Sequence, residues 1–317
     1  MKNTIITAIV ALIAITGSVL GFVFSPSINE TQLQTLKVLG IVCGSGALYC
    51  FVVGELARNN SQMDKLWSVL PIAYTWIVAG MGGWSARLIV IAVIVTLWGI
   101  RLTFNFARKG AYSIKFWAGE EDYRWTVLRQ NKLLSNRISW AAFDLFFISI
   151  YQNALVLAMT LPAVAVMSST EPFGVLDYVF AGLALSCLIL ETVADEEQWK
   201  FHQKKKELAA SGLTREEFPE PYNKGFNTFG LWKMARHPNY FGEQSIWVCL
   251  YLFCISAKVT NYGVFNWSLF GCLFIILLFL GSSAFGESVS SSKYPEYQYY
   301  QKEVSKYIPN PFRKYKR

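Results

Sequence analysis

A chain of 317 residues with 53% hydrophobic and only 16% charged residues departs from soluble domains, in which about 25% of the residues are charged. The formal net charge is +8, a balance that favours anionic partners such as phosphorylated ligands or anionic lipids. Because the basic residues lie in the connections between apolar runs, nucleic acid is excluded as a partner and an integral membrane protein is predicted.

Eight apolar runs approach the roughly 20 residues that a helix needs to cross a bilayer. The predicted fold class is therefore all-α, a polytopic membrane bundle of about eight transmembrane helices. The first run is expected to be a retained helix, since it is longer than the apolar part of a secretory signal and no small-residue cleavage site follows it. In chain order the runs cover residues 5–24, 37–53, 64–80, 87–106, 138–159, 174–194, 241–257 and 264–285.

The charges of the connections orient this bundle. Basic residues gather between the fourth and fifth runs, between the sixth and seventh, and in the tail after the eighth, whereas the alternate connections are short and carry few charges. With eight spans all three basic stretches fall on one side of the membrane. The positive-inside rule makes that side cytoplasmic, with both termini on it.

Metal chemistry and the common soluble-enzyme motifs are excluded. The only histidines are His202 and His237, and the six cysteines all lie in apolar runs without metal-binding spacing, so the cysteines are expected to be small packing residues. The glycine-rich phosphate loops, the zinc-protease motif and the hydrolase elbow do not occur. Any chemistry must therefore come from polar groups at the ends of the predicted helices, and no metal is expected.

Two polar clusters lie at the predicted cytoplasmic ends of the fourth and sixth helices. Arg101 falls inside an apolar run and Arg108 closes it. An arginine at membrane depth usually faces a partner or a polar ligand, and snorkelling to the interface is the alternative. Glu191, Asp195 and His202 share one face at helical spacing. This face is suited to hydroxyl, amide or ribose groups, and a solvated helical extension is the alternative.

The third polar cluster occupies residues 236–243, with the sequence Arg-His-Pro-Asn-Tyr-Phe-Gly-Glu. Pro238 suits the first turn of a helix, and donors gathered at a helix N-terminus favour an anion. An interfacial cap rich in polar and aromatic residues is the alternative. The residues of this cluster expected to contact a ligand are Arg236, His237, Asn239, Tyr240 and Glu243.

The third cluster, the acidic helix before it and the ending Tyr294-Pro295-Glu296-Tyr297 with Ile308-Pro309 resemble the C-terminal domain of steroid 5-alpha-reductase-like proteins. The Trp-Gly-x-Arg-Leu element at 98–102 resembles that superfamily's largely uncharacterised membrane-protein branch more closely. The resemblance is strong over 176–309 and partial over 64–110. It implies a multi-helix membrane reductase that binds NADPH in a cytoplasm-facing cavity and reduces a carbon–carbon double bond conjugated to a carbonyl. Matched residue by residue, it implies cofactor contacts at Arg101, Asp195, Asn239, Glu243 and, more loosely, Tyr297.

The resemblance also implies an acid that polarises the substrate carbonyl, where charge develops. In the steroid reductases a Glu and a Tyr do this, and by spacing these positions fall near Asp64 and on Trp98. An indole can donate a hydrogen bond but not act as an acid. Either another donor substitutes beside Asp64, with Tyr74 and Tyr151 as the candidates, or the reaction differs from that of the steroid reductases.

The chain is expected to form one membrane domain over 1–317, in which helices of 1–137 shape a substrate entrance and 138–317 hold the cofactor. The expected substrate is an apolar lipid, sterol-like or polyprenoid, that enters from the bilayer, by analogy with the family. Two other functions stay open. An isoprenylcysteine-type methyltransferase would use S-adenosylmethionine on a distantly related architecture, and a non-catalytic membrane protein would keep only the fold.

Overall fold

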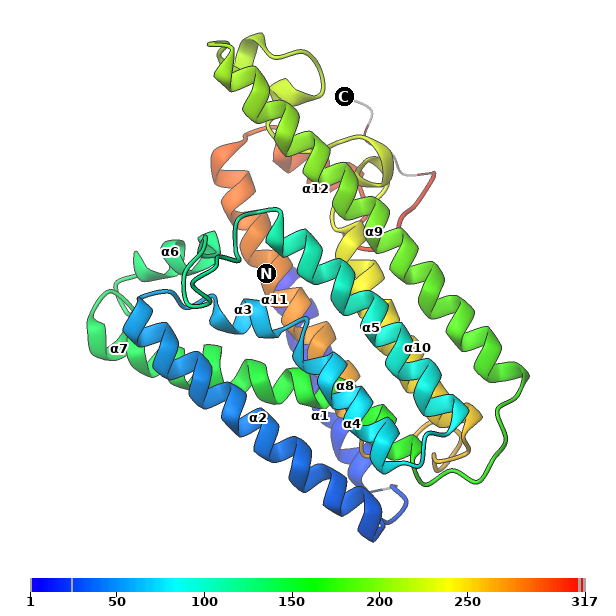
Figure 1. Ribbon diagram of the computed structural model, residues 1–317. Helices are drawn as coiled ribbons and strands as arrows, with labels where there is room; N and C mark the ends of the chain where they lie inside the picture. The colour runs from blue at the N-terminus through cyan, green and yellow to red at the C-terminus, as the bar shows by residue number, and fades with distance from the viewer. Residues whose placement is uncertain (1, 24, 313–314, 316–317) are drawn as a thin grey trace. The chain divides into compact units, whose positions relative to one another are not determined.

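The computed structural model describes residues 2–23, 25–312 and 315 of the chain. The prediction of an all-α fold is confirmed: the described part contains helices and no strand beyond two isolated bridges. In chain order the elements are α1 (Lys2–Val23), α2 (Glu30–Ala57), α3 (Gln62–Leu66), α4 (Leu70–Met81), α5 (Ala86–Ala107), α6 (Tyr123–Arg129), α7 (Arg137–Phe143), the π-helix η1 (Asp144–Tyr151), α8 (Gln152–Val166), α9 (Val175–Ala210), the 3-10 turns η2 (Arg215–Glu217), η3 (Tyr222–Lys224) and η4 (Gly230–Lys233), α10 (Pro238–Ser256), α11 (Leu269–Lys293) and α12 (Tyr297–Glu303) (Figure 1).

Five helices of the described chain are long and apolar enough to cross a membrane, which supports a multi-pass membrane protein. They are Glu30–Ala57, Ala86–Ala107, Arg137–Val166, Val175–Ala210 and Leu269–Lys293. α1 and α10 coincide with the first and seventh predicted runs but are not among these five, and residue 24, which ends the first run, lies outside the described residues. The predicted total of eight is therefore not reached by length and composition alone.

The third predicted span is wrong as a single helix. Residues 64–80 are divided between α3 and α4. Pro71 stands at the start of α4, where its missing N–H interrupts the helical hydrogen-bond ladder that would have joined the two pieces. α4 keeps only 12 residues, about 18 Å of helix, and is therefore shorter than the ~30 Å hydrocarbon layer.

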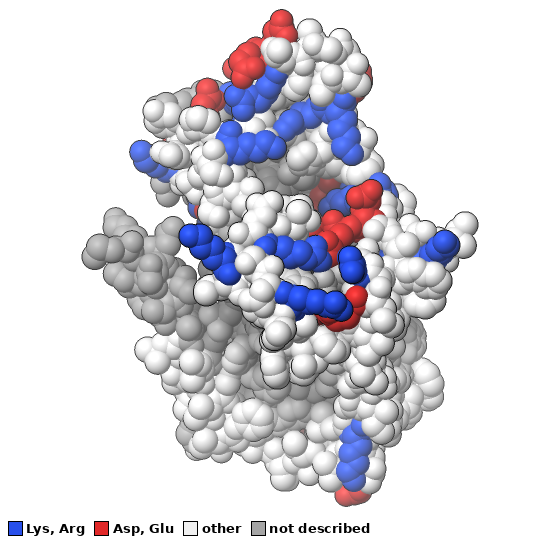
Figure 2. All heavy atoms as spheres, turned by 90° about the vertical axis from the view of Figure 1, so that its left-hand side faces the viewer, with Lys and Arg blue, Asp and Glu red and all other residues white. Residues whose placement is uncertain are grey.

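The surface is that of a protein in lipid. Figure 2 shows charged side chains gathered into a few groups, with wide uncharged areas between them. α2 exposes large apolar side chains along its length, with Ile41, Leu48 and Leu56 exposed by 69%, 65% and 82%. Such a row would aggregate in water, whereas hydrocarbon solvates it at no cost.

The described chain divides into two compact units. The first consists of residues 1–11, 182–248 and 276–317, and the second of residues 12–181 and 249–275. The first unit contains the polar end of α9, the start of α10 and the C-terminal tail, and thus the motif at 236–243. The second unit contains α2 to α8, of which α2, α4 and α8 contact one another.

A buried polar strap organises the second unit. The connection after α5 folds back on the segment between α2 and α4, where Lys65 donates to the carbonyls of Phe116 (3.1 Å) and Ala118 (2.7 Å). Asn59 Nδ2 donates to the Gly119 carbonyl at 3.0 Å. These side chains donate to backbone carbonyls of the irregular segment 116–119, which has no helical hydrogen bonds of its own. With its carbonyls satisfied, the segment can pack against the helices.

Candidate functional site

The candidate site is built on two helices of the first unit, α9 and α10. The predicted row on α9 is present: Glu191 is buried, Asp195 is half-buried, and His202 lies at the exposed end beside Gln198, with Gln198 Nε2 and His202 Nε2 at 3.1 Å. α9 is one helix of 36 residues, about 54 Å long, so part of it extends beyond the hydrocarbon layer. The sixth predicted span ended at 194, and the polar row continues the same helix.

α10 begins at Pro238, as the sequence predicted. Proline has no backbone N–H, so Pro238 leaves no unsatisfied donor in the first turn of the helix. Asn239 and Glu243 follow at helical spacing on one face, and Trp247 Nε1 donates to Glu243 Oε1 at 3.2 Å. Glu243 is thereby fixed and is nearly fully buried.

A glycine lets the two helices approach closely. A Cβ at Gly242 would lie 2.7 Å from Glu191 Cβ and 3.0 Å from the Cys187 carbonyl oxygen. The hydrogen atom in its place allows Asn239 to reach α9, where Asn239 Nδ2 donates to Asp195 Oδ1 at 3.0 Å. Two residues that the family resemblance assigns to the cofactor, Asp195 and Asn239, are therefore in direct contact.

The contact between Asp195 and Asn239 leaves the Asn239 side-chain oxygen without a donor among the described residues. The Asp195 carboxylate accepts from the Asn239 amide nitrogen, so the orientation of the amide is fixed. Asn239 Oδ1 is buried and has no hydrogen-bond partner among the described residues. An acceptor held in this way costs about 1–3 kcal/mol when nothing donates to it, so the position is suited to a donor from a ligand.

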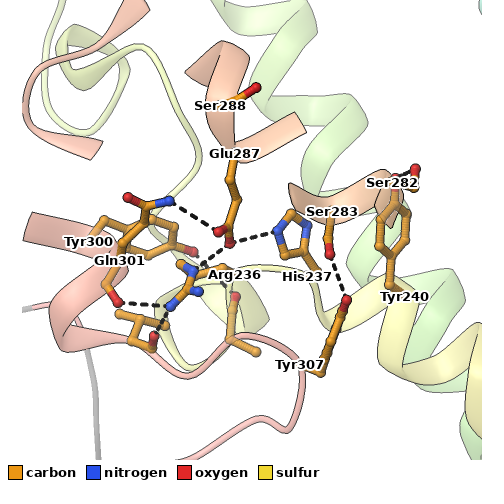
Figure 3. Close-up of polar contacts among 12 residues, drawn as sticks. Arg236, His237, Tyr240, Ser282, Ser283, Glu287, Ser288, Tyr300, Gln301 and Tyr307 are labelled. Atoms are coloured by element: carbon orange, nitrogen blue, oxygen red, sulfur yellow. Dashed lines mark hydrogen bonds and ion pairs between the residues drawn. The ribbon is translucent and has the colours of Figure 1, made fainter. Parts of the chain in front are cut away.

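Arg236 and His237 are engaged inside the protein (Figure 3). Arg236 Nε donates to Glu287 Oε1 at 2.7 Å, and His237 Nε2 lies 3.0 Å from the same oxygen. Gln301 Nε2 donates to the second oxygen, Glu287 Oε2, at 3.1 Å. The sequence assigned Arg236 and His237 to a ligand, but the structure gives their side chains to a carboxylate of α11 that the sequence analysis did not single out.

The same segment clamps the C-terminal tail. The backbone N–H groups of Arg236 and His237 donate to the carbonyls of Ser305 and Lys306, both at 2.9 Å. The Tyr307 hydroxyl lies 2.6 Å from Ser283 Oγ on α11, as Figure 3 shows. The buried ion pair therefore joins the start of α10, α11 and the tail.

The charge state of this cluster follows from burial. Burial lowers the pKa of the His237 ring below its ordinary value, against the opposite effect of Glu287. His237 is thus neutral near pH 7 and donates its Nε2–H to the carboxylate. Burial likewise lowers the pKa of Lys306, again opposed by Glu287.

Two predicted aromatic contacts have packing partners in the first unit. Tyr240 stacks on the His237 ring, with centroids 5.3 Å apart and planes at 15°. Tyr297 is buried in an aromatic cluster, edge-on to Phe226 at 5.0 Å. The ring of Tyr297 is therefore part of the core that the tail forms over the loop after α9.

The other predicted site residues belong to the second unit. Arg101 is half-buried in α5, and Arg108 Nε donates to Asn105 Oδ1 at 2.9 Å. Tyr151 ends the π-helix, half-buried and stacked on Phe147 at 5.4 Å. Tyr74 on α4 is fully buried.

Asp64, which the sequence predicts beside the donor at the substrate carbonyl, is bound by two side chains from the start of α6. Its two oxygens accept from Arg124 Nη2 at 3.1 Å and from Trp125 Nε1 at 2.9 Å. Burial raises the pKa of the Asp64 carboxyl, and the charge of Arg124 opposes the rise. The carboxyl thus anchors the start of α6 to α3.

Comparison with known proteins gives a family without an assigned activity. The family described as "Protein of unknown function (DUF1295)" matches residues 50–304. The chain is 32% identical over 280 residues to "Uncharacterized protein C594.04c" of Schizosaccharomyces pombe, a match that covers 83% of this chain and 78% of that protein. No solved structure matches the chain.

Proposed function

The chain belongs to the DUF1295 family, and from this premise we propose that it is a membrane-embedded, NADPH-dependent reductase. The proposed reaction is reduction of a carbon–carbon double bond conjugated to a carbonyl in a lipid or sterol-like substrate. The resemblance of the motif at 236–243 to steroid 5-alpha-reductase-like proteins supports the reaction. We further propose that the cofactor site and both termini face the cytoplasm, because the basic stretches then lie inside.

The contact between Asp195 and Asn239 is the observation that carries the cofactor proposal. It holds an amide oxygen in place with no donor on it among the described residues. Ribose hydroxyls and the nicotinamide amino group are donors of the kind that this oxygen requires. The phosphates of NADPH need cations, and the first unit carries exposed lysines, among them Lys206 and Lys233, that are candidates for this role.

When bound, NADPH supplies the hydride that is added to the double bond. The residues of the chain bind and orient: Asn239 and Asp195 form the polar contact, and Trp247 fixes the Glu243 carboxylate. The reaction also requires a hydrogen-bond donor at the substrate carbonyl. Tyr74 is the better candidate than Asp64, because both Asp64 oxygens already accept hydrogen bonds whereas the Tyr74 hydroxyl has no nitrogen or oxygen partner among the described residues.

Titration of the purified full chain in detergent with NADPH, followed by fluorescence enhancement, tests the proposal. We expect wild type to bind, and Asn239→Ala and Glu243→Ala to weaken binding roughly tenfold or more, equivalent to about 1.4 kcal/mol. Asn131→Ala, a substitution of the same type at an exposed position of the second unit, is the matched control.

Two results would contradict the proposal. If wild type does not bind NADPH, the reductase proposal is wrong. Retention of labelled S-adenosylmethionine in the same preparation would then support the methyltransferase. Equal NADPH affinity of wild type and both variants would show that the nucleotide binds elsewhere. Thermal unfolding of each variant in parallel separates lost binding from lost folding.

A further inference from the structure

Two fully buried polar atoms of the second unit lack nitrogen or oxygen partners among the described residues. The Tyr74 side chain on α4 and the Asn153 side chain on α8 are both 0% exposed. The Tyr74 hydroxyl and Asn153 Oδ1 have no nitrogen or oxygen hydrogen-bond partner among the described residues. Each such atom costs about 1–3 kcal/mol inside a protein, and in hydrocarbon no bulk water is present to offset it.

The orientation of Asn153 is fixed. Its Nδ2 donates to the Ser149 carbonyl at 2.8 Å and approaches Cys50 Sγ at 3.7 Å. A flipped amide would set its oxygen against the Ser149 carbonyl oxygen, and two acceptors repel each other. The atom without a partner is therefore an acceptor. It lies against α2, since a Cβ at Gly46 would be 2.8 Å from it.

The Tyr74 hydroxyl lies on the same face of α2. Its neighbours are the thiol of Cys43, a weak acceptor for the phenol O–H, and the thiol of Cys50. These two cysteines flank Gly46 at spacings of three and four residues. Leu70, one turn before Tyr74 on α4, also contacts the Gly46 position, with its Cδ1 3.3 Å from an added Cβ. The Tyr74 hydroxyl and Asn153 Oδ1 therefore both have neighbours on the Cys43–Cys50 stretch of α2.

We propose that Tyr74 and Asn153 form a subsite for the hydroxyl group of an otherwise apolar lipid. A hydroxyl accepts from the Tyr74 phenol and donates to Asn153 Oδ1, so it satisfies both atoms, whereas a carbonyl oxygen or an ether satisfies only Tyr74. An anionic headgroup does not fit, because the adjoining Gly46 and Leu70 offer no cation and the carboxylates of Asp144 and Asp64 act on the neighbouring Cys50. The occupant is therefore a long-chain or polycyclic alcohol reaching the site from the bilayer.

Tyr74 has one O–H, so an alcohol bound here occupies the donor that the proposed reaction would use at the substrate carbonyl. The inference therefore concerns binding of the alcohol alone and does not treat it as the enone substrate. Binding itself requires neither NADPH nor the α9–α10 site. The subsite lies within α2, α4 and α8 of the second unit, whereas Asn239 belongs to the first. The two proposals can therefore fail separately.

A set of three matched lipids tests the subsite: geranylgeraniol, its methyl ether and the parent hydrocarbon. Thermal unfolding of the full chain in detergent is recorded against the concentration of each, without nucleotide. We expect the alcohol to raise the Tm at the lowest concentration, the ether at a higher one, and the hydrocarbon to leave the Tm unchanged. Tyr74→Phe, which removes only the hydroxyl, and Asn153→Leu should each weaken the response to the alcohol roughly tenfold.

Tyr151→Phe is the matched control, because it removes a phenol hydroxyl from the same unit at a half-buried position. It should keep the full response, as should Asn239→Ala. The subsite is refuted if alcohol and hydrocarbon act alike. It is also refuted if Tyr74→Phe raises the Tm without lipid and leaves the alcohol response intact, since the pair would then hold at most a water molecule.

Discussion

Removal of the Glu287 carboxylate should loosen the whole C-terminal half of the first unit. Arg236 and Glu287 form an ion pair whose side chains are only 11% and 8% exposed. Glu287→Leu leaves the guanidinium buried without a counter-charge and also removes the acceptor of His237 and Gln301. Breaking a buried pair at one partner costs about 3–5 kcal/mol.

The double variant Arg236→Leu/Glu287→Leu should cost less than the sum of the single variants, because no charge is then left unpaired. Glu207→Gln is the control: its partner Lys204 is on the surface, and exposed pairs contribute about 0–1 kcal/mol.

Thermal unfolding in detergent at one fixed scan rate measures the global effect, and we expect Glu287→Leu to lower the Tm by roughly 5–10 °C. Hydrogen exchange measures the local one. The amides of Arg236 and His237 donate to the tail and should lose protection in the variant before the rest of α10 does. If Glu287→Leu unfolds like wild type and keeps this protection, the buried pair does not hold the tail against the start of α10.

Two further predictions concern the same unit. The unfolded His237 ring titrates near pH 6.5 and the pKa of the folded ring is lower, so the unfolded state binds more protons below that pH. Stability is then full above about pH 6.5 and falls on acidification by at most about 1.4 kcal/mol per pH unit. Unfolding midpoints measured from pH 7.5 to 5 should fall less steeply for His237→Gln, and parallel curves would contradict the assignment. Gly242→Ala should destabilise by about 1–3 kcal/mol, because the new Cβ meets Glu191 Cβ at 2.7 Å, and should weaken NADPH binding. Gly281→Ala, with nothing within 4 Å, should do neither, and equal effects of the two substitutions would show that the α9–α10 contact is not tight.

The sequence predicts the helices of this protein better than their ends. Apolar runs mark the membrane helices because hydrocarbon imposes a minimum length, and Pro238 marks the start of α10 because its ring suits only the first turn of a helix. Pro71 carries the same signal for α4, but it lies within an apolar run, so the break between α3 and α4 was missed. The helical spacing of Glu191, Asp195 and His202 predicts that α9 continues beyond the apolar run that ends at 194, and the structure confirms it. The end of α9 at Ala210 carries no comparable signal, since a charged helical extension has the composition of a loop.

The site was predicted by residue type and not by partner. The sequence predicts both Asp195 and Asn239 as site residues, yet their contact depends on Gly242, whose role is visible only once α9 lies against α10. Glu287 lies two residues beyond the apolar run 264–285, and the sequence alone gives it no partner. A carboxylate one turn after Ser283, just past such a run, is the signal that could have identified it, since a buried acid requires a cation and Arg236 is one of few candidates.

The two asparagines that carry the proposals share one feature. In both, the amide nitrogen donates to an acceptor that cannot donate in return, Asp195 for Asn239 and the Ser149 carbonyl for Asn153. The amide can therefore not rotate to satisfy its oxygen, and each oxygen remains buried without a donor among the described residues. A leucine at either position would avoid this cost, which at about 1–3 kcal/mol is large against the stability of a folded protein. A ligand that donates to the amide oxygen recovers this cost. An asparagine whose nitrogen is held by an acceptor and whose oxygen is buried without a donor is therefore a physical reason to expect a ligand donor at that oxygen.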